Sequence, residues 1–244
     1  MNDPSPTEAL TLAAIGDLHV TETSHNRYRD MFVEISEKAD VLALCGDLTN
    51  FGKTSEAEIL AEDLKHCTIP MVGVLGNHDY ECGVPDEVAK IFSDVGVRML
   101  GEQAVMIDGV GFAGVKGFVG GFGRGELGPF GENAIKAFVD ESREEARKLE
   151  NALRSLRTER VVAVLHYAPI PETAEGEPLE IYPFLGSSRL AHAVDRFDNV
   201  KAVVHGHAHR GRYRGATPRG IPVYNCAQYV LEPAFGRPYA LLEI

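Results

Sequence analysis

The sequence predicts an α/β fold formed by a single domain, and three observations lead to this prediction. Short apolar runs alternate along the chain with stretches of helical periodicity, as in sheets whose strands are joined by helices. The length of 244 residues allows one large hydrophobic core. Apolar residues make up 44% of the chain and charged residues 25%, which is typical of a globular protein. We therefore treat residues 1–244 as one domain, without an internal repeat or a dividing linker.

The first part of the chain contains three apolar runs that are typical of buried strands. These expected strands are 10–16, 40–45 and 70–75. A helix is expected over 55–66, because Ser55 and Glu58 have the spacing of a capping box. A second helix is expected over about 86–95, since Pro85 suits the first turn of a helix.

The pattern changes after residue 97. Short strands are expected up to residue 116, with a hairpin turn at Asp108-Gly109. A glycine-rich loop over 117–131 and a long charged helix over about 133–157 follow. Four more strands are expected at 161–165, 201–204, 221–225 and 239–243. Between these strands lie a proline-rich loop at 168–186 and a short helix near 188–197.

Polar side chains directly follow five of the expected strands. These residues are Asp17, His19, Asp47, Asn77, His78, His166, His205 and His207. An Asp after a strand is by itself a common turn residue, but five strand ends with similar side chains indicate a shared role. Because ligands bind at the carboxyl ends of strands in α/β sheets, we expect these side chains to gather at one edge. Carboxylates and imidazoles together suit Zn, Fe, Mn or Ni, whereas Ca prefers oxygen ligands.

The order of these motifs resembles the calcineurin-like metallophosphoesterase family, whose pattern runs DxH, GD, GNHD, H and GHxH. The corresponding residues here are Asp17-Leu18-His19, Gly46-Asp47, Gly76-Asn77-His78-Asp79, His166 and His205-Gly206-His207. The resemblance implies a two-sheet β-sandwich flanked by helices and a site for two transition-metal ions. It implies that Asp47 bridges the two ions. The other implied ligands are Asp17, His19 and His207 for the first ion, and Asn77, His166 and His205 for the second.

The resemblance also implies hydrolysis of a phosphate ester by a hydroxide that bridges the two metals. His78 is then expected to donate a proton to the leaving group or to stabilise the transition state. Asn50 stands where the family's phosphoprotein phosphatases have an Asp that orients this histidine, and its amide oxygen could accept an imidazole N–H. Asp79, the last residue of GNHD, is counted with His78 and Asn50 as an expected catalytic residue. The segment GDLTN looks most like the small bacterial cyclic-nucleotide phosphodiesterase branch.

Several segments near the motifs have two interpretations. The loops at 117–131 and 168–186 either cover the metals or are ordinary surface loops. The helix at 133–157 is either a solvated surface helix or a contact for a partner. His209 continues the alternation of His205 and His207, but we expect it to be an ordinary surface histidine.

The expected function is hydrolysis of a small phosphomonoester or phosphodiester, with a nuclease or a non-catalytic metal-binding scaffold as alternatives. The net charge of −12 argues against a nucleic-acid partner. A membrane partner is not expected, because no apolar run approaches the roughly 20 residues of a membrane span. The polar start MNDPSPTEAL lacks the pattern of a secretory signal, so we expect a cytoplasmic protein. The oligomeric state is left open.

Overall fold

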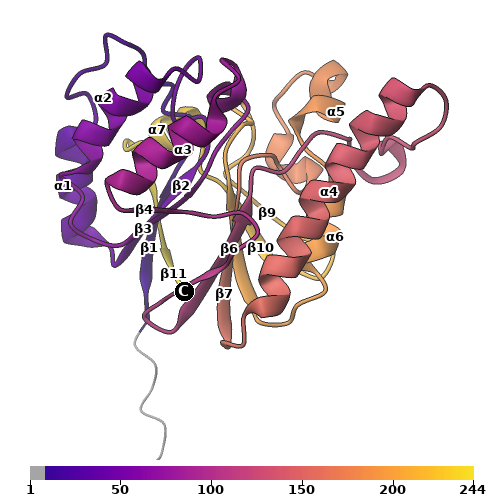
Figure 1. Cartoon of the computed structure of the whole chain (residues 1–244). Helices are drawn as coiled ribbons and strands as arrows, with labels where there is room; N and C mark the ends of the chain where they lie inside the picture. The colour runs from indigo at the N-terminus through magenta and orange to yellow at the C-terminus, as the bar shows by residue number, and fades with distance from the viewer. Residues whose placement is uncertain (1–8) are drawn as a thin grey trace, which may run out of the picture.

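The computed structural model describes residues 9–244, which form two β-sheets packed face to face (Figure 1). The first sheet has the order β11-β1-β2-β3-β4. Its strands are β11 (Ala240–Glu243), β1 (Thr11–Ile15), β2 (Val41–Cys45), β3 (Met71–Val74) and β4 (Val97–Met99). Strands β1 to β4 run parallel to their neighbours, and β11 is antiparallel to β1. The carboxyl ends of β1, β2 and β3 therefore lie at the same edge.

The second sheet has the order β5-β6-β7-β8-β10-β9. Its strands are β5 (Val105–Ile107), β6 (Val110–Val115), β7 (Arg160–Leu165), β8 (Val200–His205), β10 (Pro222–Asn225) and β9 (Arg214–Ala216). The four central strands are parallel, and the two edge strands are antiparallel to their neighbours. Because β7 and β8 are parallel neighbours, the segments that follow them leave the sheet on the same side.

The alternation of side chains along each strand builds two hydrophobic layers at once. In β1, Leu12 and Ala14 pack between the two sheets, whereas Ala13 and Ile15 pack against the helices on the outer face. The facing sheet contributes Phe112 to the layer between the sheets. Since both faces of the strands are buried, their sequences are continuous apolar runs, which is why the sequence reveals them clearly.

Helices cover the outer faces of both sheets (Figure 1). The helices on the first sheet are α1 (Arg29–Lys38), α2 (Thr54–Leu64) and α3 (Pro85–Asp94), and those on the second sheet are α4 (Asn133–Ser155) and α6 (Ser188–Val194). Phe32, Leu60 and Phe92 anchor the first three helices in the core. This helix–sheet–sheet–helix arrangement confirms the predicted two-sheet sandwich flanked by helices. No helix in residues 9–244 is long and apolar enough to cross a membrane.

Several elements differ from the sequence-based expectations. Helices α1 and α7 (Gln228–Phe235) and strand β9 were not expected. The expected loop at 168–186 contains η3 (Pro171–Ala174), η4 (Leu179–Ile181) and α5 (Tyr182–Leu185), and the loop at 117–131 contains η2 (Gly123–Gly125). The predicted capping box is wrong, because Ser55 lies inside α2 and its hydroxyl donates to Glu22 Oε1 at 2.9 Å.

Candidate metal centre

The segments after five strands converge at one edge of the sandwich. Three groups of side chains there have ligand atoms within 4.8 Å of one another. The first group is Asp17 with His19 and His209, the second is Asp47 with His166 and His207, and a third, His19 with Asp47 and His78, shares residues with both. The residues of these groups follow β1, β2, β3, β7 and β8, so they are far apart in sequence and adjacent in space.

The first group, formed by Asp17, His19 and His209, points three ligand atoms at one position. Asp17 Oδ1 lies 3.0 Å from His209 Nε2, and His19 Nε2 lies 3.4 Å from the same nitrogen. His19 also approaches a neighbouring carboxylate, with its Nε2 at 3.9 Å from Asp47 Oδ2. These distances bring two imidazoles and a carboxylate within reach of a single cation.

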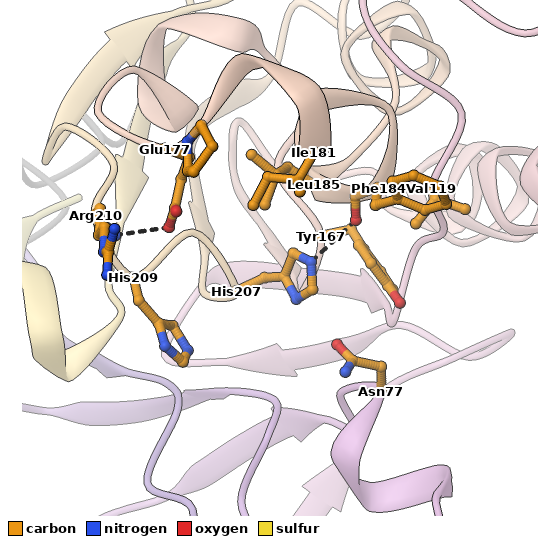
Figure 2. A pocket seen from close by; sticks show the side chains of 11 residues that line it. Asn77, Val119, Tyr167, Glu177, Ile181, Phe184, Leu185, His207, His209 and Arg210 are labelled. Carbon is orange, nitrogen blue, oxygen red and sulfur yellow. Dashed lines mark hydrogen bonds between the residues drawn. The ribbon is translucent and has the colours of Figure 1, made fainter.

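The second group gathers around His166. His166 Nε2 lies 3.3 Å from Asp47 Oδ1, 2.9 Å from Asn77 Oδ1 and 3.2 Å from His207 Nδ1. The other nitrogen of each imidazole is engaged by a main-chain carbonyl: His166 Nδ1 donates to Cys45 O at 2.9 Å. His207 Nε2 donates to Phe184 O at 3.1 Å (Figure 2). Both histidines are thereby held with a lone pair directed at the other ligand atoms.

Three hydrogen-bond acceptors of the second group converge on one point. With these tautomers, His166 Nε2, His207 Nδ1 and Asn77 Oδ1 all present lone pairs to the same point, and no proton lies between them. A cation at that point would be coordinated by the three lone pairs, which otherwise repel one another. The residues of the second group therefore fit a metal ion.

Asp47 stands between the two groups. Its Oδ1 accepts from His78 N at 2.8 Å, and its Oδ2 faces His19. Burial, together with the charges of Asp17 and Asp79, raises the pKa of Asp47 to about 9. A cation beside this carboxyl group would reverse that effect and keep it ionised at neutral pH.

The imidazoles of His19 and His207 are neutral at pH 7 and therefore suited to metal binding. Burial lowers the pKa of His19 to about 4 and that of His207 to about 3. Both rings are therefore neutral at pH 7, with a free lone pair. Burial alone would lower the pKa of His209, but the hydrogen bond to Asp17 and the charge of that carboxylate raise it above its ordinary value.

The backbone is strained at the predicted ligands. Asp17, His19, Asp47 and His207 have positive φ angles of 61°, 44°, 49° and 71°. This left-handed conformation costs a non-glycine residue roughly 1–2 kcal/mol. In residues 9–244 only two other non-glycine residues have it, Asn26 and Asp108. Such strain concentrates where function requires a particular side-chain direction.

Two motif glycines allow the strand ends to approach one another. A Cβ atom on Gly76 would overlap Asp47 N and Oδ1. A Cβ atom on Gly206 would lie 2.5 Å from Asp17 Oδ2 and 2.9 Å from Cys45 O. Glycine is therefore required at these positions by close packing around the carboxylates.

His78 is held differently from the expectation. Its Nδ1 lies 2.7 Å from the main-chain oxygen of Asn50, so the backbone of Asn50 orients the ring and the expected contact through the amide side chain is absent. His78 Nε2 then faces the centre, 4.0 Å from Asp47 Oδ2. The side chain of His78 is 40% exposed, so the ring lies at the surface of the centre.

Asp79, expected to be catalytic, is buried and contacts the turns around the centre. Its buried carboxylate accepts from Thr49 N at 2.8 Å, Thr49 Oγ1 at 2.6 Å and Gly76 N at 2.8 Å, with a longer contact from Leu48 N at 3.3 Å. The turn after β2 and the turn after β3 are thus tied together. Asp79 belongs to none of the three ligand groups.

His205 lies outside the ligand groups and His209 lies in one of them, whereas the reverse was expected. His205 is fully buried, with its Nδ1 2.7 Å from Gly206 O and its Nε2 2.8 Å from Thr173 Oγ1. His209, expected to be a surface residue, lies with Asp17 and His19 instead. The alternation fails because β8 ends at His205 and the backbone turns at His207.

A motif in the sequence does indicate that His207 and His209, and not His205, are the candidate ligands. The motif GHxH requires a glycine before its first histidine, and Gly206-His207-Ala208-His209 matches it letter by letter. In the structure His207 accordingly lies with Asn77 and His166, and His209 lies with Asp17. This arrangement differs from the expectation, which grouped His207 with Asp17 and His19, and His205 with Asn77 and His166.

Sequence reasoning missed some of the aromatic surroundings. The centroid of the Tyr229 ring, on α7, lies 4.5 Å from that of the His209 ring. The ring of Tyr167, which directly follows His166, has its centroid 4.4 Å from that of the His207 ring. Nothing in the sequence pattern singles out Tyr229, because α7 itself was not expected.

A pocket of about 680 Å³ opens beside the second group (Figure 2). Its lining residues are Asn77, Val119, Tyr167, Glu177, Pro178, Ile181, Phe184, Leu185, His207, His209 and Arg210. The segment 168–186 thus borders the centre, whereas the segment 117–131 contributes Val119. The two segments also contact each other, since Gly121 N donates to Gly186 O at 2.9 Å.

Comparison with solved structures supports the fold. Phosphopantetheinyl hydrolase from Mycobacterium tuberculosis aligns with a TM-score of 0.66 and 15% identity, over 97% of each chain. The protein TT1561 of Thermus thermophilus aligns with a TM-score of 0.60 and 16% identity, over 97% of this chain and 99% of that one. Purple acid phosphatase PPD1 from yellow lupin (Lupinus luteus) aligns with a TM-score of 0.51 and 15% identity, over 89% of this chain and 44% of that one.

Comparison of sequences gives the family. No curated protein sequence matches the chain. The sequence pattern of the calcineurin-like phosphoesterases, however, matches residues 10–211, which is most of the chain and includes every group of the candidate centre. The chain belongs to the calcineurin-like phosphoesterase family.

Proposed function

We propose that this protein is a metal-dependent phosphoesterase that binds two transition-metal ions and hydrolyses a small phosphomonoester or phosphodiester. The observation that carries the proposal is the position of Asp47 between two groups of ligand atoms. The residues that would hold the first ion are Asp17, His19 and His209, and those that would hold the second are Asn77, His166 and His207. Asp47 would contribute to both.

The donor set favours Mn, Fe, Zn or Ni, because imidazole and carboxylate ligands suit these metals. Two such cations, when bound, supply positive charge for the phosphoryl oxygens and lower the pKa of a water molecule. The contribution of the chain is to hold its ligands in place before the substrate arrives. The main-chain carbonyls of Cys45 and Phe184 do this for His166 and His207.

His78 is the residue that we assign to proton transfer. Because its Nδ1 donates to Asn50 O, Nε2 is the atom that can gain or lose a proton. Nε2 lies 4.0 Å from Asp47 Oδ2 on a side chain that is 40% exposed, so it would be placed to deliver a proton to the leaving-group oxygen of a bound ester. Asn50 and Asp79 act as positioning residues for this step.

The proposed substrate is small and phosphorylated, and no nucleic acid or membrane partner is proposed. The net charge of −12 supports a substrate other than nucleic acid, which disfavours the alternative of a nuclease. A non-catalytic scaffold would be expected to lack some metal ligands or His78. The carboxylate and imidazole ligands and His78 are all present, which supports catalysis. The similarity of GDLTN to the cyclic-nucleotide phosphodiesterase branch and the cytoplasmic location remain predictions from the sequence.

Parallel assays test this function. Metal-free protein is incubated with Mn, Fe, Zn or Ni, and the hydrolysis of 4-nitrophenyl phosphate and of bis(4-nitrophenyl) phosphate is measured. We expect at least one ester to be hydrolysed with at least one metal, and the activity to disappear on chelation. Tight metal binding without hydrolysis of either ester would favour the scaffold.

A further inference from the structure

The pocket beside the second ligand group has an apolar end and a polar end (Figure 2). Val119, Ile181, Phe184 and Leu185 form the apolar end, and the ring of Tyr167 borders it. Its volume of about 680 Å³ is in the range of pockets that hold small organic molecules. The size and composition of the pocket therefore fit an organic group larger than a phosphate ion.

Two apolar side chains of this end are exposed. Phe184 is 57% exposed and Ile181 is 39% exposed, although both lie on a segment whose neighbour Leu185 is buried. Exposed apolar side chains that line one concave surface commonly mark a binding site. Burial of Phe184 against a bound apolar group would remove from water a surface that folding leaves exposed.

The apolar end is continuous with the candidate metal centre. Phe184 O accepts from His207 Nε2 at 3.1 Å, and the Tyr167 ring lies 4.4 Å from the His207 ring. Asn77 also lines the pocket. A phosphate held at the second ligand group would therefore have these apolar side chains beside it, within reach of its ester substituent.

Charged residues line the pocket only at its other end. Glu177 and Arg210 lie there, near His209, and Glu177 Oε1 accepts from Arg210 N at 2.7 Å (Figure 2). At the apolar end no described lining residue carries a charge. A charged substituent placed there would lose its hydration without gaining a partner.

From these observations we infer that the organic group of the substrate is uncharged and apolar, aromatic or aliphatic, and that it packs against Phe184 and Tyr167. This inference rests on the proposed function and makes it more specific. It assigns Phe184 as a residue that determines specificity, through contact with the substituent.

Two esters whose leaving groups differ in charge test the inference. We would compare kcat/KM for 1-naphthyl phosphate and 3-carboxyphenyl phosphate in the wild-type protein, in Phe184→Ala and in Leu179→Ala. Leu179 is a matched control, because it is 75% exposed on the same segment and does not line the pocket. The substitution at Phe184 keeps the main-chain carbonyl that contacts His207.

We expect the wild type to prefer the naphthyl ester. Phe184→Ala should lower kcat/KM for that ester about tenfold, mainly through KM, and should change the carboxyphenyl ester little, because the loss is that of an apolar contact. Metal content should be unchanged, and Leu179→Ala should behave as the wild type. Equal use of the two esters by the wild type, or an equal loss of both esters in Phe184→Ala, would overturn the inference.

A binding measurement separates this inference from the proposed function. The probes are the non-hydrolysable 1-naphthylmethylphosphonate and its 3-carboxyphenyl counterpart, titrated into the metal-loaded protein by calorimetry. If the protein hydrolyses no ester but binds the naphthyl probe about tenfold more tightly than Phe184→Ala does, the proposed function fails and the pocket assignment stands. Equal affinity of the wild type and Phe184→Ala for this probe overturns the assignment, whatever the activity.

Discussion

At the scale of single residues, the centre depends on which nitrogen of each imidazole lacks a proton. His166 and His207 each donate one N–H to a main-chain carbonyl, and each therefore presents its other nitrogen as a lone pair. The two rings use opposite nitrogens, Nε2 in His166 and Nδ1 in His207. The protonated nitrogen of each ring is set by the carbonyl of Cys45 or Phe184, which is distant in sequence, so no motif could have predicted it.

The exchanged places of His205 and His209 lead to a first prediction. His209→Ala should remove one ligand of the first ion and lower the metal content, because its Nε2 faces Asp17 and His19. His205→Gln should keep the full metal content, since His205 contacts Thr173 instead. Metal analysis of both purified variants checks this. Loss of metal in the His205 variant alone would restore the original assignment, in which the family resemblance made His205 a ligand.

A second prediction concerns His78 and its support. His78→Ala should keep its metals and slow turnover by about 10²–10⁴-fold, most strongly for esters with poor leaving groups, because a proton donor is lost. Asn50→Ala should retain activity within a few-fold, because the contact to His78 comes from the main-chain oxygen. Steady-state kinetics on aryl phosphates of graded leaving-group acidity measure both effects. An equal loss for good and poor leaving groups in His78→Ala argues against proton donation.

At the scale of elements, the turns after the strands create the site. They combine positive φ angles at the ligands with glycines where the backbone passes close to a carboxylate. The motifs GD, GNHD and GHxH predicted which strands end at the candidate metal centre, because each motif contains a glycine and a candidate metal ligand. Helices α1 and α7 gave no comparable signal. Helix α7 even contains Pro233, and its place is set by tertiary packing of Leu231 in the core.

The turn after β3 leads to a third prediction. Gly76→Ala should displace Asp47, lowering metal content and activity together, because the added Cβ overlaps Asp47 Oδ1. Gly101→Ala is the matched control, since a Cβ atom there has open space and the φ angle requires no glycine. Metal analysis and activity of the two variants decide the matter. A fully metallated and active Gly76→Ala protein would contradict the tight approach of these turns.

At the scale of the whole molecule, the alternation of apolar runs with helices predicted an α/β fold. The division of the strands into two facing sheets came only from the family resemblance. The physical reason is that buried strands of either sheet have the same continuous apolar pattern, so the pattern does not say which sheet a strand joins. The pairing of β6 with β7, across the long helix α4, is an example.

The buried histidines give the metal-free protein a predictable acid sensitivity. Burial lowers the pKa of His19 and His205 to about 4 and that of His207 to about 3, below the ordinary value of 6.5. Between pH 6.5 and about 4 the unfolded chain therefore binds protons that the folded chain does not. The contribution of these histidines to the free energy of unfolding should fall as the pH is lowered through this range, by up to about 1.4 kcal/mol per pH unit for each histidine. Asp47, whose pKa is raised to about 9 in the folded chain, acts in the opposite direction.

Urea unfolding of the metal-free protein at pH 7 and pH 5 measures this effect. His205→Gln should lose less stability than the wild type over the same interval, because one of the buried titrating groups is removed while a side chain able to hydrogen-bond Thr173 remains. The same pH dependence in both proteins would show that His205 does not contribute to it.

The central claim is that two metal ions share the carboxylate of Asp47. The most direct measurement is the metal content and the phosphoesterase activity of Asp47→Asn beside the wild type, both loaded with the metal that supports activity. We predict about two ions per chain in the wild type, and in Asp47→Asn a marked loss of metal together with loss of hydrolysis. An Asp47→Asn protein that is fully metallated and active would contradict the claim.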